Sequence, residues 1–310
     1  MKRRNFIEKS IFSALAFISL PSFGTPLKEK NKSFRVVHVT DMHISKNPKV
    51  KKGVTAMLVE IDALVKKPDF IINTGDSISD ALKQPKNEVS SQWQAFSTYF
   101  KDKLKYPLHS VIGNHDVWGW GLKDEKVKKD PLYGKEWALQ MLSMGNRYYT
   151  FMHKSWKFIC LDSPLHVSTK RPYTAQLDDE QFNWLETELQ NTDTETPVCI
   201  VSHIPILSAS VFYDGDNTVN GNWQVPGGWM HIDSKKIKSL FYKHKNVKVA
   251  LSGHVHLADK TEYLGVNYIC NGAASGGWWN GPYQEFGPAY AVIDFNDDGT
   301  VESKLIPYEF

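Results

Sequence analysis

Cysteine is scarce in this sequence, with 3 residues in 310. So few cysteines exclude a disulfide-framework protein and a cysteine-rich zinc module. Long hydrophobic runs are scarce as well: only the stretch 11–20 approaches the length of a membrane span, and we therefore expect no stable membrane span. The chain is instead 41% hydrophobic and 23% charged, which is the composition of a globular protein that can bury a core.

Net charge is also small. The whole chain carries a formal charge of +3, and the first 24 residues account for all of it, with four basic side chains and one acidic side chain. The rest of the chain is therefore neutral. Proteins that bind a nucleic-acid polymer neutralise many phosphates with lysine and arginine, so we expect no such partner. The sequence indicates no protein partner either.

The segment 1–24 has the pattern of a signal peptide. Arg3 and Arg4 belong to a positively charged start, residues 11–20 are apolar, and small residues precede the expected cleavage site. The arginine pair followed by an aromatic residue resembles a twin-arginine export signal; an ordinary secretory signal and an uncleaved anchor are the alternatives. We expect an exported protein, periplasmic or secreted, with a single domain over residues 25–310.

Apolar strand-like runs alternate with amphipathic helical stretches, which predicts a layered α/β fold. Two long segments interrupt this alternation: a charged, loop-like one at 117–146, and one that contains Gly, Asn and Trp at 205–232. A hairpin is expected over 147–162. The expected strands cover 34–44 (with the loop that follows), 69–74, 108–112, 197–203 and 247–252, and the expected helices cover 51–66, 88–103, 178–190 and 233–244.

Five short motifs stand where the predicted strands end. In α/β sheets, loops at the carboxyl ends of strands meet at one edge, where ligands bind. Glycine in such loops lets the backbone approach closely. We therefore expect the polar residues of these motifs to form one cluster. The motifs are Asp41-Met42-His43, Gly75-Asp76, Gly113-Asn114-His115-Asp116, Ser202-His203 and Gly253-His254-Val255-His256.

The side chains in these motifs are ligands for metal ions. Carboxylate, amide oxygen and imidazole without thiolate suit Mn, Fe or Zn, whereas Mg and Ca prefer sites made of oxygen atoms. Seven candidate ligands exceed the needs of one ion and fit two ions that share a carboxylate. Two ions about 3.5–4 Å apart can clamp the attacking and leaving oxygens of a displacement at phosphorus.

In this order, the five motifs resemble those of the calcineurin-like metallophosphoesterase family, and the resemblance covers residues 36–256. It implies a four-layer α/β/β/α sandwich with a dinuclear metal site at the carboxyl ends of the strands. Ser202 stands where the family often has glycine. By position, the resemblance places Asp41, His43 and His256 on the first ion, Asn114, His203 and His254 on the second, and Asp76 between the two.

The resemblance also implies a reaction: a hydroxide held between the two ions attacks a small phosphate ester, with His115 as the general acid and Asp116 orienting it. His203 followed by Pro205 resembles the cyclic-nucleotide-phosphodiesterase-like branch, which favours a nucleotide-like diester. The segment 271–282 resembles a stretch of exported bacterial members. A phosphomonoesterase, or an inert binding module on the same fold, is the alternative.

Tryptophans adjoin two of the glycine-containing loops. Trp118 follows the Asn-His-Asp motif, and Trp278 and Trp279 follow a pair of glycines. Aromatic rings beside a phosphate site can stack on a base or a sugar, so these three are candidate substrate-binding residues, with packing as the alternative. For Trp223 and Trp229 we expect packing only.

The export signal is directly testable. Changing both Arg3 and Arg4 to Lys preserves the charge of the segment but removes the guanidinium pair that defines a twin-arginine signal. We expect this variant to accumulate in the cytoplasm as a folded precursor, measured by cell fractionation and immunoblotting. A Lys2→Arg variant is the control that leaves the pair intact. Normal export of the double-lysine variant would instead indicate an ordinary secretory signal.

Overall fold

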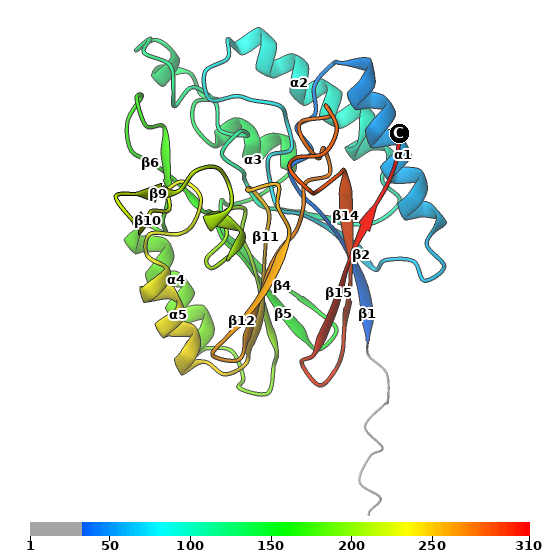
Figure 1. The fold of residues 1–310 in the computed structure, drawn as a ribbon, viewed down its shortest axis with the longest axis vertical. Coiled ribbons are helices and arrows are strands. Elements are labelled where there is room, and N and C mark those ends of the chain that lie inside the picture. The colour runs from blue at the N-terminus through cyan, green and yellow to red at the C-terminus, as the bar shows by residue number, and fades with distance from the viewer. Residues whose placement is uncertain (1–32) are drawn as a thin grey trace, which may run out of the picture. The chain divides into compact units, whose positions relative to one another are not determined.

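The computed structural model describes residues 33–310, which lie within one compact unit, Asn31–Phe310. The signal peptide predicted for residues 1–24 lies outside the described residues. Two mixed sheets form the centre of this unit (Figure 1). The first sheet has the order β15 (Val301–Pro307), β14 (Ala289–Phe295), β1 (Phe34–Val39), β2 (Phe70–Asn73) and β3 (Leu108–Ser110).

The second sheet has a parallel centre, β13-β11-β8-β5, with an antiparallel strand at each edge. In the first sheet β1, β2 and β3 are likewise parallel. Parallel neighbours have their carboxyl ends at the same edge. The second sheet has the order β12 (Asp259–Tyr263), β13 (Val266–Cys270), β11 (Val247–Ser252), β8 (Val198–Val201), β5 (Trp156–Cys160) and β4 (Tyr149–His153).

Both faces of the central strands are buried, because each strand divides its residues between two hydrophobic clusters. In β1, Val36 packs into the cluster between the sheets and Val37 into the cluster beneath the helices. In β8, Cys199 and Ile200 alternate in the same way. Each fully buried aliphatic side chain contributes about 1.5–3 kcal/mol to folding. The near-continuous apolar runs in the sequence therefore reflect strands covered on both sides.

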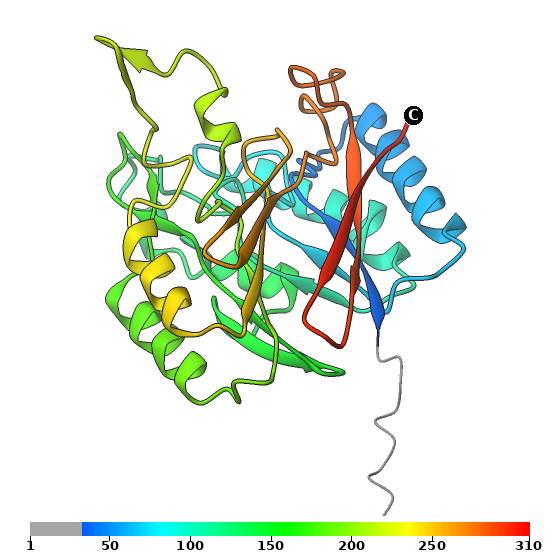
Figure 2. The same ribbon diagram turned by 60° about the horizontal axis from the view of Figure 1, so that its bottom comes forward.

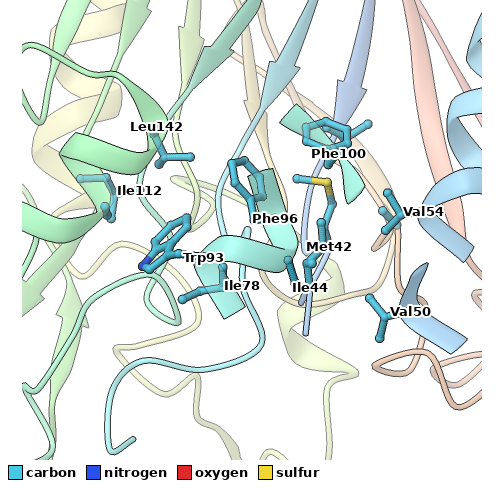
Figure 3. Packing of buried hydrophobic residues seen from close by; sticks show 14 of the residues in the cluster. Met42, Ile44, Val50, Val54, Ile78, Trp93, Phe96, Phe100, Ile112 and Leu142 are labelled. Atoms are coloured by element: carbon cyan, nitrogen blue, oxygen red, sulfur yellow. The ribbon is translucent and has the colours of Figure 1, made fainter. Parts of the chain in front are cut away.

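Helices cover the outer face of each sheet. Residues of α1, α2 and α3 pack with those of β1, β2 and β14, while α4 and α5 pack against β8, β11 and β13. Figure 3 shows the helix residues Val54, Phe96 and Leu142 in the first of these clusters. The mixed α/β class is confirmed, and the clusters are consistent with the α/β/β/α order predicted. The helices are α1 (Pro48–Ala63), α2 (Lys86–Tyr99), α3 (Glu136–Leu142), α4 (Asp179–Gln190) and α5 (Ser234–Lys243).

Both ends of α1 differ from the prediction, and an N-terminal cap explains the difference at its start. The helix begins at Pro48 rather than at residue 51, since the Asn47 side chain accepts a hydrogen bond from the Lys49 amide at 2.9 Å. Asparagine at the N-cap and proline at the first position are favourable at a helix start. The helix also ends at Ala63, three residues early.

The two interrupting segments contain more structure than predicted. The segment 117–146 holds α3, whose Trp137 and Leu142 belong to the core beneath the first sheet. The segment 205–232 carries the hairpin of β9 and β10, which projects from the body (yellow-green in Figure 2). The remaining short elements are η1 (Lys101–Lys103), η2 (Val127–Lys129), β6 (Pro164–His166), β7 (Tyr173–Ala175), η3 (Ser210–Phe212), β9 (Thr218–Val219) and β10 (Asn222–Trp223). Over residues 33–310, every helix is too short or too polar to span a membrane.

Candidate metal centre

Loops from both sheets bring the predicted ligands together. Four of the ligands follow strands β1, β2 and β3 of the first sheet, and three follow β8 and β11 of the second. The loop after β1 is tied to the loop after β2, since the Asp41 amide donates to the Gly75 carbonyl at 3.0 Å and the His43 amide to the Asp76 carbonyl at 2.9 Å. The cluster therefore lies where the carboxyl ends of the two sheets meet.

The first group consists of Asp41, His43 and His256, all buried, with candidate ligand atoms within 4.8 Å of one another. The Nε2 atoms of the two histidines are 3.0 Å apart. Asp41 Oδ1 lies 3.7 Å from His256 Nε2 and has no hydrogen-bond partner, although it is buried. Three electron-rich atoms thus face one small space.

The second group surrounds His203. Its Nε2 atom lies 3.0 Å from Asn114 Oδ1, 3.1 Å from His254 Nδ1 and 3.3 Å from Asp76 Oδ2. The same Asp76 oxygen is 3.9 Å from His43 Nε2 of the first group. Asp76 is therefore placed between the two groups, where the resemblance puts a shared ligand.

In both histidines of the first group, the hydrogen-bond partner of Nδ1 determines which ring nitrogen carries the hydrogen. Nδ1 of His256 lies 2.6 Å from the Gly276 carbonyl, and Nδ1 of His43 lies 3.3 Å from the Ser79 carbonyl. A carbonyl only accepts hydrogen bonds, so both Nδ1 atoms carry hydrogen, and in the neutral rings both Nε2 atoms present lone pairs. Two lone pairs 3.0 Å apart repel unless a cation lies between them. This arrangement fits a metal site in which backbone carbonyls orient the ligating rings.

His203 follows the same rule. Its Nδ1 lies 2.7 Å from the Thr74 carbonyl, which leaves Nε2 unprotonated in a neutral ring. Without metal, burial opposes protonation of this ring, but the Asp76 carboxylate raises the pKa of His203 to about 9. Burial also opposes the charge on Asp76, yet His203 and His115 hold the pKa of Asp76 well below its usual range. The site is thus built around a buried anion, which a divalent cation would neutralise.

The backbone at the ligands is strained. Five of the seven ligands have left-handed φ angles: 51° at Asp41, 42° at His43, 49° at Asp76, 78° at His254 and 59° at His256. Residues other than glycine adopt this conformation at a cost of about 1–3 kcal/mol each, and such residues cluster at functional sites. A fold that holds five of them side by side needs compensating interactions at the site.

Glycine allows the ligand loops to approach one another. A Cβ atom on Gly113 would lie 2.1 Å from the Asp76 amide nitrogen, and one on Gly253 would lie 1.9 Å from Thr40 Oγ1. Both distances are shorter than any non-bonded contact permits. The Gly-Asn-His-Asp and Gly-His-Val-His motifs therefore begin with glycine because a side chain would push neighbouring loops of the site apart.

The carboxylate beside His115 is Asp80, not Asp116. His115 Nδ1 lies 3.2 Å from Asp80 Oδ1, whereas Asp116 accepts hydrogen bonds from the amides of Ser77 at 2.8 Å and Gly113 at 2.9 Å. The prediction that Asp116 orients His115 is therefore wrong. Asp116 instead joins the loop after β2 to the loop after β3, and burial together with the Asp76 charge raises the pKa of Asp116 to about 7.

Two of the three candidate stacking tryptophans belong to the core. Trp118 is 2% exposed, packs edge-on against Trp137 and donates to the Gln84 carbonyl. Trp279 is 3% exposed and donates to the Met42 carbonyl. Both were wrongly assigned to substrate binding. Trp278 is 44% exposed and lies over the His256 ring, with 4.2 Å between ring centroids.

A cavity of about 350 Å³ opens onto both ligand groups. His115 and Trp278 line it, as expected, and so does Trp229, for which packing alone was predicted. The sequence does not point to the other lining residues, because all of them except Val255 lie in segments without a metal-ligand pattern. None of the described residues that line this cavity is a lysine or an arginine. Apart from the predicted metal ligands, His115 and Trp278, the lining residues are Tyr173, Asp214, Gly215, Trp229, Val255 and Tyr283.

The family is settled by comparison with known sequences. The family model for calcineurin-like phosphoesterases matches residues 34–258, which is most of the chain and contains all seven ligands. The chain belongs to the calcineurin-like phosphoesterase family. It is therefore a metal-dependent hydrolase of phosphoric esters, and it contains two groups of residues that could each hold a metal ion.

The chain is also similar to two curated phosphodiesterases. It is 24% identical to a probable glycerophosphodiester phosphodiesterase of Arcobacter nitrofigilis, over 73% of each chain. It is 21% identical to a 3',5'-cyclic-nucleotide phosphodiesterase of Nostoc, over 88% of this chain and 92% of the relative. Both names contain the reaction class that the motifs favour, and neither identity is high enough to transfer a substrate.

Solved structures support the fold. A dimetal phosphatase from Danio rerio superposes with a TM-score of 0.58 at 14% identity, covering 89% of this chain and 99% of that one. A purple acid phosphatase from yellow lupin gives a TM-score of 0.56 at 17% identity, covering 90% of this chain and 54% of that one. At such identities the likeness shows the fold alone.

The contact between Asp80 and His115 predicts a leaving-group effect. An Asp80→Asn variant keeps the shape of the side chain but loses the charge that orients and stabilises a protonated His115 ring. We expect kcat/KM to fall about 10- to 100-fold on esters with alkyl alcohol leaving groups, and much less on 4-nitrophenyl esters, whose leaving oxygen needs little protonation. Steady-state kinetics on both substrate types measure this ratio.

Asp116→Asn is the matched control, because Asp116 contacts backbone amides rather than the ring. It should lower the melting temperature while leaving the ratio between alkyl and aryl substrates unchanged. Equal losses on both substrate types in Asp80→Asn, or a changed ratio in Asp116→Asn, would contradict this assignment.

Proposed function

We propose that the protein hydrolyses a small, nucleotide-like phosphodiester. The observation that carries this proposal is the charge of the cavity. Among the described residues, no lysine or arginine lines this cavity, and the Asp214 carboxylate does line it. We therefore expect the positive charge of the cavity to come from the metal ions that fit the two ligand groups. A diester carries one negative charge, whereas a monoester carries close to two at neutral pH.

A second negative charge on a substrate calls for additional cationic donors, usually arginine or lysine. The Asp214 carboxylate would repel that charge instead. The two curated relatives, named as a glycerophosphodiester phosphodiesterase and a cyclic-nucleotide phosphodiesterase, also support a diester substrate. The phosphatase names among the solved structures accompany only a likeness of fold.

The ions themselves are proposed to be Mn, Fe or Zn, since the ligands are imidazole, carboxylate and amide oxygen. Asp41, His43 and His256 would hold one ion, Asn114, His203 and His254 the other, and Asp76 both. When bound, such a pair supplies a nucleophile at neutral pH and neutralises charge on the phosphoryl group.

The chain's own residues do the rest of the chemistry. His115 lines the cavity and makes its Nδ1 contact with Asp80, so its Nε2 is the atom that can give a proton to the departing alcohol oxygen. The neighbouring Asp76 and Asp80 raise the pKa of His115 against the effect of burial. Trp278 covers the His256 ring and shields that side of the cavity from water.

We also propose that the protein is exported, on the strength of the signal pattern in residues 1–24. The described residues neither support nor oppose this location. The cell-fractionation experiment on Arg3 and Arg4 decides it.

A substrate panel tests the proposed function. The purified protein, loaded separately with Mn, Fe or Zn, is assayed on bis(4-nitrophenyl) phosphate, 4-nitrophenyl phosphate, a cyclic nucleotide and a glycerophosphodiester. We expect kcat/KM for the aryl diester to exceed that for the aryl monoester at least about tenfold, which corresponds to 1.4 kcal/mol of repulsion at Asp214. An Asp214→Asn variant should reduce this preference.

A preference for the monoester would establish the phosphomonoesterase alternative. No turnover of any ester with any of the three metals would establish an inert binding module. The His115→Ala variant is the control for catalysis by the site itself, and it should retain its ions while losing activity on the natural alcohol leaving groups.

A further inference from the structure

A second, larger cavity adjoins the one above the metal ligands. It measures about 630 Å³, a size typical of small-molecule sites. Its walls come from the segment that carries the β9–β10 hairpin and from the chain around residues 257–259 and 284–286. None of these residues belongs to the five motifs, and the proposed hydrolysis makes no use of them.

The two cavities adjoin one another along three segments of the chain. Asp214 lines the metal-site cavity, Asp216 lines the second one, and Gly215 lines both. In the same way the lining passes from His256 to Leu257, and from Tyr283 to Gln284 on the opposite side. A substrate with its phosphate over the metal ligands would therefore have the second cavity beside one of its alcohol groups, with the Tyr283–Asp214 hydrogen bond at the boundary.

Aromatic rings form much of the wall of the second cavity. Phe212, Tyr213, Trp223 and Phe286 line it. Trp223 is 59% exposed and makes an edge-on contact with Phe212, so much of its ring surface is accessible to a ligand. Exposed aromatic faces attract cations through the negative potential of the ring, most strongly for tryptophan.

All the charged residues that line the second cavity are acidic. They are Asp216, Asp259 and Glu285, and among the described residues no lysine, arginine or histidine lines it. One oxygen of Asp259 accepts hydrogen bonds from Ser208 Oγ at 2.7 Å and from the Ser210 amide at 2.6 Å, while the other is buried without a hydrogen-bond partner. The wall therefore carries negative charge that no neighbouring basic side chain neutralises.

We propose that this cavity, with its aromatic rings and unneutralised carboxylates, binds an organic ammonium group on one alcohol of the phosphodiester substrate. The combination discriminates among ligands. A phosphate or a carboxylate would be repelled, and a bare metal ion would gain nothing from the rings. A neutral base could stack on Trp223 but would leave the acidic side chains without a partner. A substituted ammonium uses both features.

This inference rests on the proposed function, because it places a second part of the same substrate. The substrate would then carry a negative phosphodiester over the metal ligands and a positive group beside Trp223. Asp214, whose carboxylate accepts a hydrogen bond from the Tyr283 hydroxyl, stands between the two and would contribute to binding of the positive group.

Two matched substrates test the inference. 4-Nitrophenyl phosphocholine carries a trimethylammonium group, and 3,3-dimethylbutyl 4-nitrophenyl phosphate has the same shape with carbon in place of nitrogen. Both release 4-nitrophenol, so chemistry at the leaving group is identical. We expect kcat/KM of the metal-loaded protein to be at least about tenfold higher for the charged substrate, the size of effect that a desolvated cation–aromatic contact gives.

Variants localise the effect. Asp216 and Glu285 are exposed, so an Asp216→Asn, Glu285→Gln double variant should fold normally, and it should reduce the preference for the charged substrate to near unity. Trp223→Ala should reduce it as well, whereas Trp223→Phe should retain most of it. Glu262→Gln is the matched control, because this exposed residue of β12 lies outside the cavity lining and removes the same charge.

Calorimetry with choline chloride on the metal-loaded protein gives a readout without catalysis. We expect choline to bind more tightly than 3,3-dimethylbutanol, and the double variant to lose this difference. Equal kcat/KM for the two diesters together with no choline binding would overturn the subsite and leave the diesterase in place. A preference for the neutral diester would also overturn it. Choline binding without hydrolysis of either diester would instead refute the proposed function and support the subsite.

Discussion

The rest of the site depends on the repulsion between unprotonated ligand atoms held at close range. Backbone carbonyls at Ser79, Thr74 and Gly276 accept the Nδ1 hydrogens of three histidines, so in the neutral rings the opposite nitrogens present lone pairs beside the carboxylates of Asp41 and Asp76. Left-handed backbone at five ligands adds to this cost. Cations relieve the repulsion between the ligand atoms, and we therefore interpret the two ligand groups as a pair of metal sites.

The same constraint explains the local sequence. Glycines precede Asp76, Asn114 and His254 because the loops must approach within contact distance, and Asp116 is used to tie two of these loops together through their amides. The two segments that interrupt the α/β alternation have different structural roles. The segment 117–146 contributes α3 to the core, whereas the segment 205–232 contributes residues to the lining of both cavities.

The clustering of the candidate ligands could be predicted from the sequence because each lies in a loop that follows a strand, and the strands place these loops at one edge. Contacts that depend on the path of a loop could not be predicted from the sequence. Asp80 reaches His115 through the turn after β2, and Asp116, although adjacent to His115, is drawn to backbone amides. Trp118 and Trp279 are equally near the motifs in sequence but point into the core, while Tyr173, Asp214 and Tyr283 come from segments without any metal-ligand pattern.

The most direct test of the shared ligand Asp76 is the number of metal ions per chain, measured by elemental analysis of protein purified with Mn, Fe or Zn. We predict two ions per chain in the wild type and fewer than one in Asp76→Asn, because that carboxylate lies between both groups. Asp116→Asn, which removes a neighbouring buried carboxylate, should keep two. A single ion in the wild type, or two ions retained by Asp76→Asn, would contradict the account.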